Sequence, residues 1–359
     1  MSRAPYMDWA KHRAPATFDL AASNLLGCSL DDLGGARDVL SLDGSNPDGF
    51  PPLVGAIAAH YDVPAERVVL GSGCSGANVL AIASAVTAGD DVVMETPHYD
   101  PIVGTCRLFG ASVRFFERRF EDGYQLDPGA LGRAMTPHTR LVVLTNPHNP
   151  SGVVLDDDNI RAAAQVAADH GAALLVDEVY LDIVNILNEG QRHTPAARLA
   201  PNAISTSSLT KSYGLNALRC GWAIGSADAA ERMRRVRDVV DGIGPVPIER
   251  LSVLAFEQMT RLAGRARDLT AANLDLFRSW AAGVPSLSLP GPARATVAFP
   301  RVDGVADTRV LCEGLLRDHD VAIVPGYFFG EPANIRISLA GRTEILREGL
   351  DRLSRFLRG

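Results

Sequence analysis

The chain has 359 residues, 47% of them hydrophobic and 21% charged, with a net charge of −7, values typical of a globular protein of about two domains. The acidic balance argues against a nucleic-acid-binding protein, because such proteins present a basic face to phosphates. No signal peptide is recognised, and no apolar run reaches the length of a membrane span, about 18 residues. The five cysteines lack paired spacing, which argues against a disulfide framework or a metal site such as zinc and indicates a cytoplasmic protein.

Short apolar runs alternate with helix-like segments between about residues 67 and 225. Continuous apolar strands joined by helices form parallel sheets that are covered on both faces. We therefore expect an α/β fold with a mostly parallel seven-stranded sheet and helices on both faces. The seven runs are RVVLGSG, DVVMETP, SVRFFE, RLVVLTNP, ALLVDEVY, AISTSS and CGWAIG.

The pattern changes after about residue 245. A long helical segment, PIERLSVLAFEQMTRLAGRARDLTAANLDLFRSWAA, leads into a few short strands and further helices, which predicts a smaller α+β domain. The first 45 residues have little sheet character and are expected to pack on that domain. We predict an N-terminal arm at 1–45, a large domain at 46–262 and a small domain at 263–359.

The carboxyl ends of the predicted strands carry polar side chains, and ligands of open parallel sheets lie beyond these ends. Ser75 and Gly76 follow the first strand at a helix start, where free N–H groups bind phosphate. Later strands are followed by an aromatic ring, an amide, a carboxylate with a phenol, and an amine with a guanidinium. These residues are Tyr99, Asn149, Asp177, Tyr180, Lys211 and Arg219. Together they meet the needs of pyridoxal phosphate, which has a phosphate, an aldehyde and a basic ring nitrogen.

Lys211 is one of only two lysines, the other being Lys11, although lysines and arginines number 35 together. Because the chain uses Arg for nearly every cation, a lysine at this position needs a chemical reason. A lysine amine can lose its proton and attack a carbonyl when its pKa is lowered, whereas Arg stays charged. We interpret Lys211 as the amine that bonds the cofactor aldehyde.

A second interpretation of the first strand end remains open at this level. GSGCSG is a literal Gly-x-Gly-x-x-Gly between a strand and a helix, and Glu95 ends the next strand, where dinucleotide-binding folds place a ribose-binding acid. This pattern predicts a nicotinamide enzyme. It leaves Asn149, Asp177 and Lys211 without roles, however, and the same glycines suit a single phosphate.

The motifs TNPHNPSG, VDEVY and SLTKSYGLNALRCG, in this order and spacing, resemble the aspartate aminotransferase superfamily, fold type I of the pyridoxal phosphate enzymes. The resemblance covers nearly the whole chain, from DGFPPLVGAIAAHY to NIRISLAG. It implies a homodimer in which Lys211 forms a Schiff base with the cofactor and Asp177 pairs with the protonated ring nitrogen. Freed Lys211 would then carry the proton from the substrate Cα.

The resemblance also implies roles for the remaining residues of the predicted site. Asn149 and Tyr180 hold the ring oxygen, and Tyr99 stacks on the ring. Ser75, Ser208 and Arg219 bind the phosphate, together with the backbone of Cys74 and Gly76. Arg336 grips the substrate α-carboxylate, and Asn149 and Asn24 are further substrate-binding residues.

The implied reaction is transfer of an α-amino group between an amino acid and a 2-oxo acid, with a pyridoxal phosphate lyase or synthase as the alternative. A non-catalytic ligand-sensing relative is disfavoured, because Lys211 and Asp177 are both present. Relatives carry a tyrosine near Gly44 that reaches the partner's phosphate, and LSLDGSNPDGF lacks it. The sequence leaves the substrate side chain open. Candidates for that pocket are Tyr6, Trp9, Asn24, His98, Tyr327 and Phe328.

Overall fold

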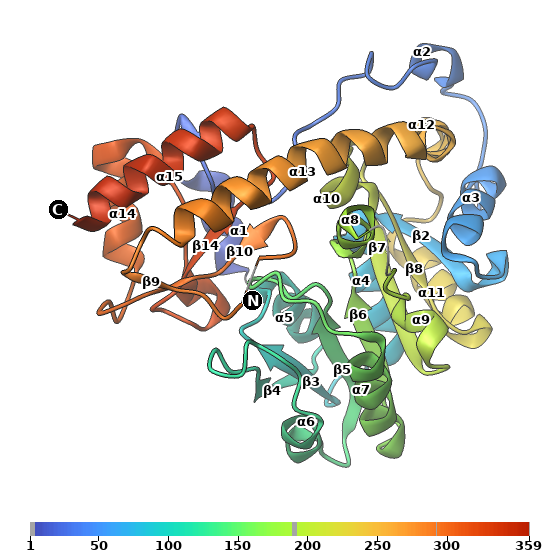
Figure 1. Ribbon diagram of the computed structural model, residues 1–359. Coiled ribbons are helices and arrows are strands. Elements are labelled where there is room, and N and C mark those ends of the chain that lie inside the picture. Colours follow the sequence, from blue (N-terminus) through green and yellow to red (C-terminus); the bar gives the residue numbers. More distant parts are fainter. Residues whose placement is uncertain (1–3, 189–191, 292, 359) are drawn as a thin grey trace.

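The computed structural model describes residues 4–188, 192–291 and 293–358, which form a large sheet-containing body and a smaller C-terminal body (Figure 1). The long helix α13 (Met259–Ala281) runs from one body to the other (Figure 1). Its first residues coincide with the predicted boundary at residue 262, and the exact domain limits stay a prediction. No helix among the described residues is both long and apolar enough to cross a membrane.

The large body is built on a seven-stranded sheet with the order β2-β8-β7-β6-β5-β3-β4. β8 is antiparallel to both of its neighbours, and all other pairs are parallel. Every run predicted from the sequence became a strand of this sheet, so the predicted α/β fold is confirmed. The strands are β2 (Val68–Ser72), β3 (Asp91–Thr96), β4 (Ser112–Glu117), β5 (Thr139–Thr145), β6 (Ala173–Asp177), β7 (Ala203–Ser208) and β8 (Cys220–Ile224).

Helices cover both faces of the sheet, and the alternation of side chains along β5 shows why. Successive residues of a strand point to opposite faces. Leu141 and Val143 belong to the apolar cluster formed with α4, α5 and α11, whereas Val142 and Leu144 belong to the cluster formed with α6, α7 and α9. The helices of this body are α3 (Pro51–Tyr61), α4 (Gly73–Ala85), α5 (Asp100–Leu108), α6 (Pro128–Ala134), α7 (Asp157–Asp169), α8 (Leu181–Leu187), α9 (Ala196–Leu199), α10 (Leu209–Tyr213), α11 (Ala227–Val240) and α12 (Val246–Glu257), with the 3₁₀ turns η1 (Ala65–Arg67) and η2 (Asn216–Leu218).

The C-terminal body combines short strands with two amphipathic helices, α14 (Arg309–His319) and α15 (Thr343–Arg358). α15 places Leu346, Leu350 and Leu353 on one buried face, at the spacing of successive helical turns. The short elements are β9 (Leu287–Ser288), β10 (Val297–Ala298), β11 (Arg301–Val302), β12 (Val321–Ala322), β13 (Val324–Pro325), η3 (Gly326–Phe329) and β14 (Ile335–Ser338). β14 lies between β10 and β13.

The N-terminal arm contacts both bodies. β1 (Phe18–Asp19) pairs in parallel with β12, as expected for an arm that packs on the small domain. α1 (Pro5–His12) instead lies against α5 of the large body, and α2 (Ala36–Val39) lies against α12. The position of α1 brings a segment from the start of the chain to the carboxyl ends of the sheet strands.

Candidate active site

A cavity of about 470 Å³ lies between the carboxyl ends of the sheet strands and α1. Most of the residues predicted from the sequence line it, although they come from elements far apart in the chain. They are Asn24, Cys74, Ser75, Tyr99, Asn149, Asp177, Tyr180, Ser208, Lys211 and Arg219. Among the residues predicted for the cofactor and the substrate carboxylate, Gly76 and Arg336 do not line the cavity.

Asp177 is the last residue of β6 and is held from three sides. It accepts hydrogen bonds from Asn78 Nδ2 at 2.7 Å, Cys74 Sγ at 3.3 Å and the Val179 N–H at 3.1 Å. Burial raises the pKa of the carboxyl group, and the bond from Asn78 is the largest influence in the opposite direction. These donors fix the orientation of a carboxylate that faces the cavity. Sequence reasoning missed Asn78, whose only signal was a polar residue among the apolar residues of α4.

Lys211 lies on α10, directly beyond the end of β7, and its amine faces the N-terminal arm. Nζ donates to Asn24 Oδ1 at 2.6 Å and to Ser23 Oγ at 3.0 Å. Burial lowers the pKa of Lys211 to about 7, helped by the positive charge of Arg336, while Asp177 acts in the opposite direction. An amine with this pKa is substantially neutral at physiological pH, which is the form that attacks a carbonyl or accepts a proton.

The N-terminus of α4 forms a cradle with Arg219. Gly73 opens this helix at a φ of 68°, and its N–H donates to the carbonyl of Arg219 at 2.7 Å. A Cβ on Gly73 would collide with the Arg219 guanidinium, and one on Gly221 would collide with the Gly73 backbone. Glycine is therefore needed at both positions to let the backbone approach this closely. The free N–H groups of the first helical turn and the guanidinium are suited to an anion.

Other predicted cofactor residues lie around this cradle. The Ser208 hydroxyl lines the cavity and also accepts from the Thr210 N–H at 3.3 Å, capping α10. Gly76 lies in the first turn of α4, where an added side chain would meet Ser72 and Gly71. Its structural role is thus to allow close packing of the helix start on β2, and its predicted phosphate contact remains a prediction.

Tyr180, Asn149 and Tyr99 surround the centre of the cavity. The Tyr180 hydroxyl is buried and makes no hydrogen bond of ordinary geometry to a described residue, although the Ser23 side chain is near enough to act on its pKa. Burial raises its pKa to about 12, so it is a neutral hydrogen-bond donor. The Tyr180 ring lies 5.9 Å from Lys211 Nζ. A buried hydroxyl without a partner costs free energy, roughly 1–3 kcal/mol, unless a bound molecule accepts its hydrogen bond.

Arg336, on β14, is sealed from the cavity by Tyr6 of α1. Nη2 donates to the Tyr6 hydroxyl at 2.5 Å and Nη1 donates to Asn149 Oδ1 at 3.2 Å. The guanidinium carbon lies 4.8 and 4.9 Å from the ring centroids of Tyr6 and Phe329, which are themselves 5.5 Å apart. A carboxylate that binds Arg336 must therefore share this arginine with the Tyr6 hydroxyl or displace it.

α1 supplies the wall opposite the sheet. Tyr6 and Trp9, which the sequence analysis placed among the candidates, line the cavity, and Phe328 packs against both rings. His98 and Tyr327 do not line it: His98 stacks on Phe115, and Tyr327 is partly exposed. Sequence reasoning missed further lining residues. These are Met7, Ala10, Lys11, Arg13, Ala21, Ala22, Ser23, Thr145, Pro147, Val179, Thr210 and Asn216.

Glu95, the acid of the dinucleotide interpretation, cannot bind a ribose. Its side chain is fully buried, accepts from the Thr145 N–H and hydroxyl at 2.7 and 2.6 Å, and pairs with Arg118 at 2.7 Å. Both carboxylate oxygens are therefore occupied inside the protein. The glycines of GSGCSG instead serve the single cradle described above.

The chain belongs to the aminotransferase class I and II family, whose model matches residues 43–353. The predicted family and the predicted aminotransferase function are thereby confirmed, and the dinucleotide interpretation is left without support.

Curated relatives carry more than one kind of name. Capreomycidine synthase of Streptomyces vinaceus is 32% identical over 99% of this chain and 93% of that protein. Aspartate aminotransferase of Pyrococcus horikoshii is 26% identical over 87% of this chain and 82% of that protein.

Solved structures show the same spread. A PLP-dependent aminotransferase from Streptococcus suis has a TM-score of 0.92 at 25% identity and covers 99% of this chain and 97% of its own. The PLP-dependent cyclase OrfR has a TM-score of 0.86 at 28% identity, with coverages of 99% and 96%. The fold is thus shared by proteins named for different reactions.

Proposed function

We propose that this family member uses pyridoxal phosphate, held at the sheet edge, to transfer the amino group of an α-amino acid to a 2-oxo acid. The observation that carries the proposal is the amine of Lys211, with a pKa near 7, in the same cavity as the buried carboxylate of Asp177. A lysine with a lowered pKa opposite an acid is the pair that this cofactor needs for its aldehyde and its ring nitrogen.

The residues present fit the cofactor. The Tyr180 hydroxyl makes no hydrogen bond of ordinary geometry in the described structure and suits the ring oxygen. The helix start at Gly73, with Ser75 and Arg219, suits the phosphate, and Asp177 suits the ring nitrogen. Tyr99 and Asn149 line the same space.

When bound, pyridoxal phosphate supplies an aromatic ring that accepts electrons from the bond broken at the substrate Cα. The Asp177 carboxyl group, oriented by three donors, would pair with the ring nitrogen, and the positive charge of that nitrogen would favour the carboxylate form. The neutral amine of Lys211 would take the proton from the substrate Cα as general base and, once charged, deliver it to the cofactor carbon as general acid. Asn149 and Arg336 would orient the substrate carboxylate, and Tyr180 would donate to the ring oxygen.

Reductive trapping tests the placement of the cofactor. Purified protein incubated with pyridoxal phosphate and reduced with borohydride should carry one pyridoxyl group, on the peptide that contains Lys211. A label distributed elsewhere, or none, would overturn the proposal. Screening single amino acids by absorbance would then identify the donor, since transamination converts the bound cofactor to a stable pyridoxamine form.

A lyase, synthase or cyclase of the same fold is the second candidate. Two similar proteins favour it, because one is named a capreomycidine synthase and another a cyclase. The two reactions differ in where the amino group ends. Release of ammonia or another leaving group, with the original cofactor spectrum restored and no oxo acid required, would replace the aminotransferase proposal with this one.

We further propose that the protein acts as a homodimer in the cytoplasm. Large apolar side chains are exposed on two segments, residues 40–42 and 239–243. The two segments lead to a contact between Gly44 and Val246. A cluster of exposed apolar side chains marks an interaction surface. Those side chains are Leu40, Leu42, Val239, Val240 and Ile243. The unpaired cysteines support a reducing compartment. Light scattering should give twice the chain mass, and Leu42→Asp combined with Val239→Asp should lower it.

A further inference from the structure

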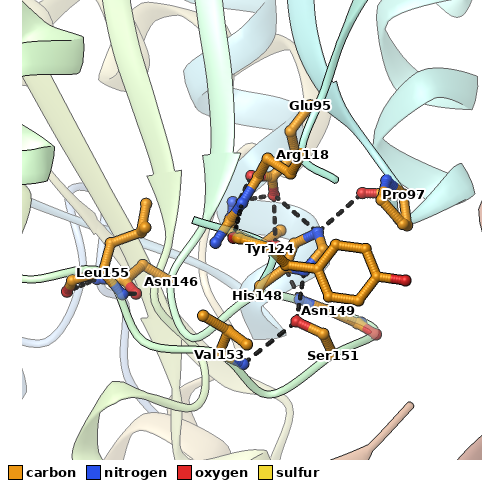
Figure 2. A network of polar contacts seen from close by, with 11 residues as sticks. Glu95, Pro97, Arg118, Tyr124, Asn146, His148, Asn149, Ser151, Val153 and Leu155 are labelled. Carbon is orange, nitrogen blue, oxygen red and sulfur yellow. Dashed lines mark hydrogen bonds and ion pairs between the residues drawn. The ribbon is translucent and has the colours of Figure 1, made fainter. Parts of the chain in front are cut away.

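A buried ion pair lies beneath the loop that carries Asn149. Glu95, the next-to-last residue of β3, and Arg118, just beyond β4, are fully buried and 2.7 Å apart (Figure 2). Burying two charged side chains costs several kcal/mol each. Two apolar side chains in their place often stabilise a core to the same extent or more. The pair therefore calls for a role beyond packing, and two chains of hydrogen bonds lead from it toward the candidate substrate site.

The first chain runs from Glu95 to Asn149. Glu95 Oε1 accepts from the Thr145 hydroxyl at 2.6 Å, and that same hydroxyl oxygen accepts from the Asn149 N–H at 2.9 Å. The Asn149 side chain in turn accepts from Arg336 Nη1 at 3.2 Å. The Thr145 hydroxyl contacts the Glu95 carboxylate and the Asn149 N–H at the same time. The position of Asn149 is therefore linked to the position of the Glu95 carboxylate.

The second chain runs from Arg118 toward β14. Arg118 Nε donates to the Tyr124 carbonyl at 2.7 Å, and the Tyr124 hydroxyl accepts from Asn334 Nδ2 at 3.2 Å. Asn334 lies two residues before Arg336 and directly before β14. Tyr124 has a φ of 55°, a left-handed conformation that is unfavourable for a residue with a side chain. The bond from Arg118 holds it there.

Neighbouring bonds make the Asn149 loop rigid. His148 Nε2 contacts the Pro97 carbonyl at 2.9 Å, so this nitrogen carries the hydrogen, and Nδ1 accepts from the Ser151 hydroxyl at 2.6 Å (Figure 2). Asn146 and Leu155 exchange two further bonds across the loop. The loop therefore has little freedom to compensate if the anchor at Glu95 is changed.

We propose that Glu95 and Arg118 are positioning residues that set the spacing between Asn149 and Arg336, and so the affinity of the site for the α-carboxylate of its substrate. The chain of hydrogen bonds from Glu95 holds Asn149 in the large body. The chain from Arg118 holds β14, the strand of the C-terminal body that carries Arg336. The inference rests on the proposed function, because that function assigns the carboxylate to Asn149 and Arg336. Neither Glu95 nor Arg118 lines the cavity, so neither touches the substrate.

The test compares two small amines on the loaded enzyme by absorbance titration. 2-Methylalanine has an α-carboxylate and no Cα hydrogen, and isopropylamine is the same skeleton without the carboxylate. The ratio of their dissociation constants measures carboxylate recognition alone. We expect Glu95→Gln, which keeps the size and removes the charge, to lower the preference for 2-methylalanine about tenfold, since a displacement of about 1 Å costs up to 100-fold. The dissociation constant of isopropylamine should not change.

A second buried ion pair provides the matched control. Glu249 and Arg237 are 3.4 Å apart and buried outside the cavity, so Glu249→Gln should lower thermal stability and leave the ratio unchanged. Thr145→Val should lower the ratio as Glu95→Gln does, and Thr145→Ser, which keeps the hydroxyl, should restore it. Thr145 itself lines the cavity, so a loss in Thr145→Val that Thr145→Ser restores shows that the hydroxyl is needed, and an unchanged ratio in Thr145→Val overturns the positioning role even if Glu95→Gln does not fold.

The outcomes separate the two levels of the proposal. If Arg336→Gln leaves the ratio unchanged, the carboxylate assignment of the proposed function is wrong. If Arg336→Gln removes the preference while Glu95→Gln and Thr145→Val keep it, only the positioning role is overturned.

Discussion

The two walls of the cavity are built in different ways. On the sheet side, Asp177 has three donors and Lys211 two acceptors, all on elements of the large body or the arm segment beside it. On the opposite side, α1 has an N-cap, Ala4, without a side-chain cap. This short helix is held by the Tyr6 N–H on Asp100, at 2.9 Å, by the Tyr6 hydroxyl on Arg336 and by aromatic packing.

This difference separates two tasks. The sheet wall holds the groups that we propose for the cofactor, and hydrogen bonds to the protein orient them. The α1 wall lies on the substrate side and must yield or share a contact before a carboxylate reaches Arg336. Changes in the sheet wall should therefore affect the chemical step, and changes in α1 should affect access and selectivity.

The largest effect is expected from Lys211→Ala. It removes both the amine that bonds the cofactor and the group that moves the Cα proton, so activity should fall about 10³-fold or more. Reduction with borohydride followed by peptide mass spectrometry should find no pyridoxyl label. Lys11→Ala, the change at the other lysine, should keep the label on Lys211, and loss of label there would contradict the assignment.

The second-largest loss of activity is expected from Asp177→Asn. The amide cannot stabilise a positive ring nitrogen, so the rate of Cα proton removal should fall about 10²-fold to 10³-fold while the cofactor stays bonded to Lys211. Stopped-flow absorbance of a single half-reaction measures this rate. A variant with full activity would show that Asp177 is only a structural carboxylate.

The pH dependence of cofactor capture gives a smaller, graded effect. Because burial and Arg336 lower the pKa of Lys211 to about 7, the amine is charged below that pH and neutral above it. Covalent capture by cofactor-free protein should therefore accelerate about tenfold from pH 6 to pH 8 and then level off. Rates that kept rising to pH 10 would show an ordinary exposed amine.

The smallest effect is expected from Tyr6→Phe, which tests the α1 wall. Arg336 loses a hydrogen bond worth about 1–2 kcal/mol, and α1 loses one of its anchors. Hydrogen exchange of the amides in residues 5–12 should become several-fold faster, with little change in the sheet strands. Tyr327→Phe, which alters an exposed tyrosine nearby, should leave the exchange as it is.

The sheet wall could be predicted from the sequence because its logic is local. Each strand is a continuous apolar run, and the parallel strands bring the residues after them to one edge, so Asn149, Asp177 and Lys211 meet whatever the loops do. The same rule placed the glycine cradle correctly, although the Gly-x-Gly-x-x-Gly pattern alone suggested another cofactor. The scarcity of lysine singled out Lys211, which lines the cavity, and its bond to a cofactor stays a prediction.

The α1 wall could not be predicted in the same way. α1 reaches the cavity through contacts with α5 and β14, which lie about 100 and 330 residues away, and no local pattern encodes such contacts. The sealing of Arg336 by Tyr6 and the burial of Glu95 are likewise tertiary features. An acidic residue at a strand end looks the same in the sequence whether its side chain binds a ligand or pairs with a buried arginine, as that of Glu95 does.

The scarcity of lysine has a practical consequence. With Lys211 enclosed, and bonded to the cofactor as we propose, the remaining lysine is Lys11, which is exposed on α1 and lines the cavity. Apart from the terminal amine, an amine-reactive fluorophore therefore attaches at a single place on the loaded enzyme. Its anisotropy would report the motion of α1 as substrate enters, without any engineered cysteine.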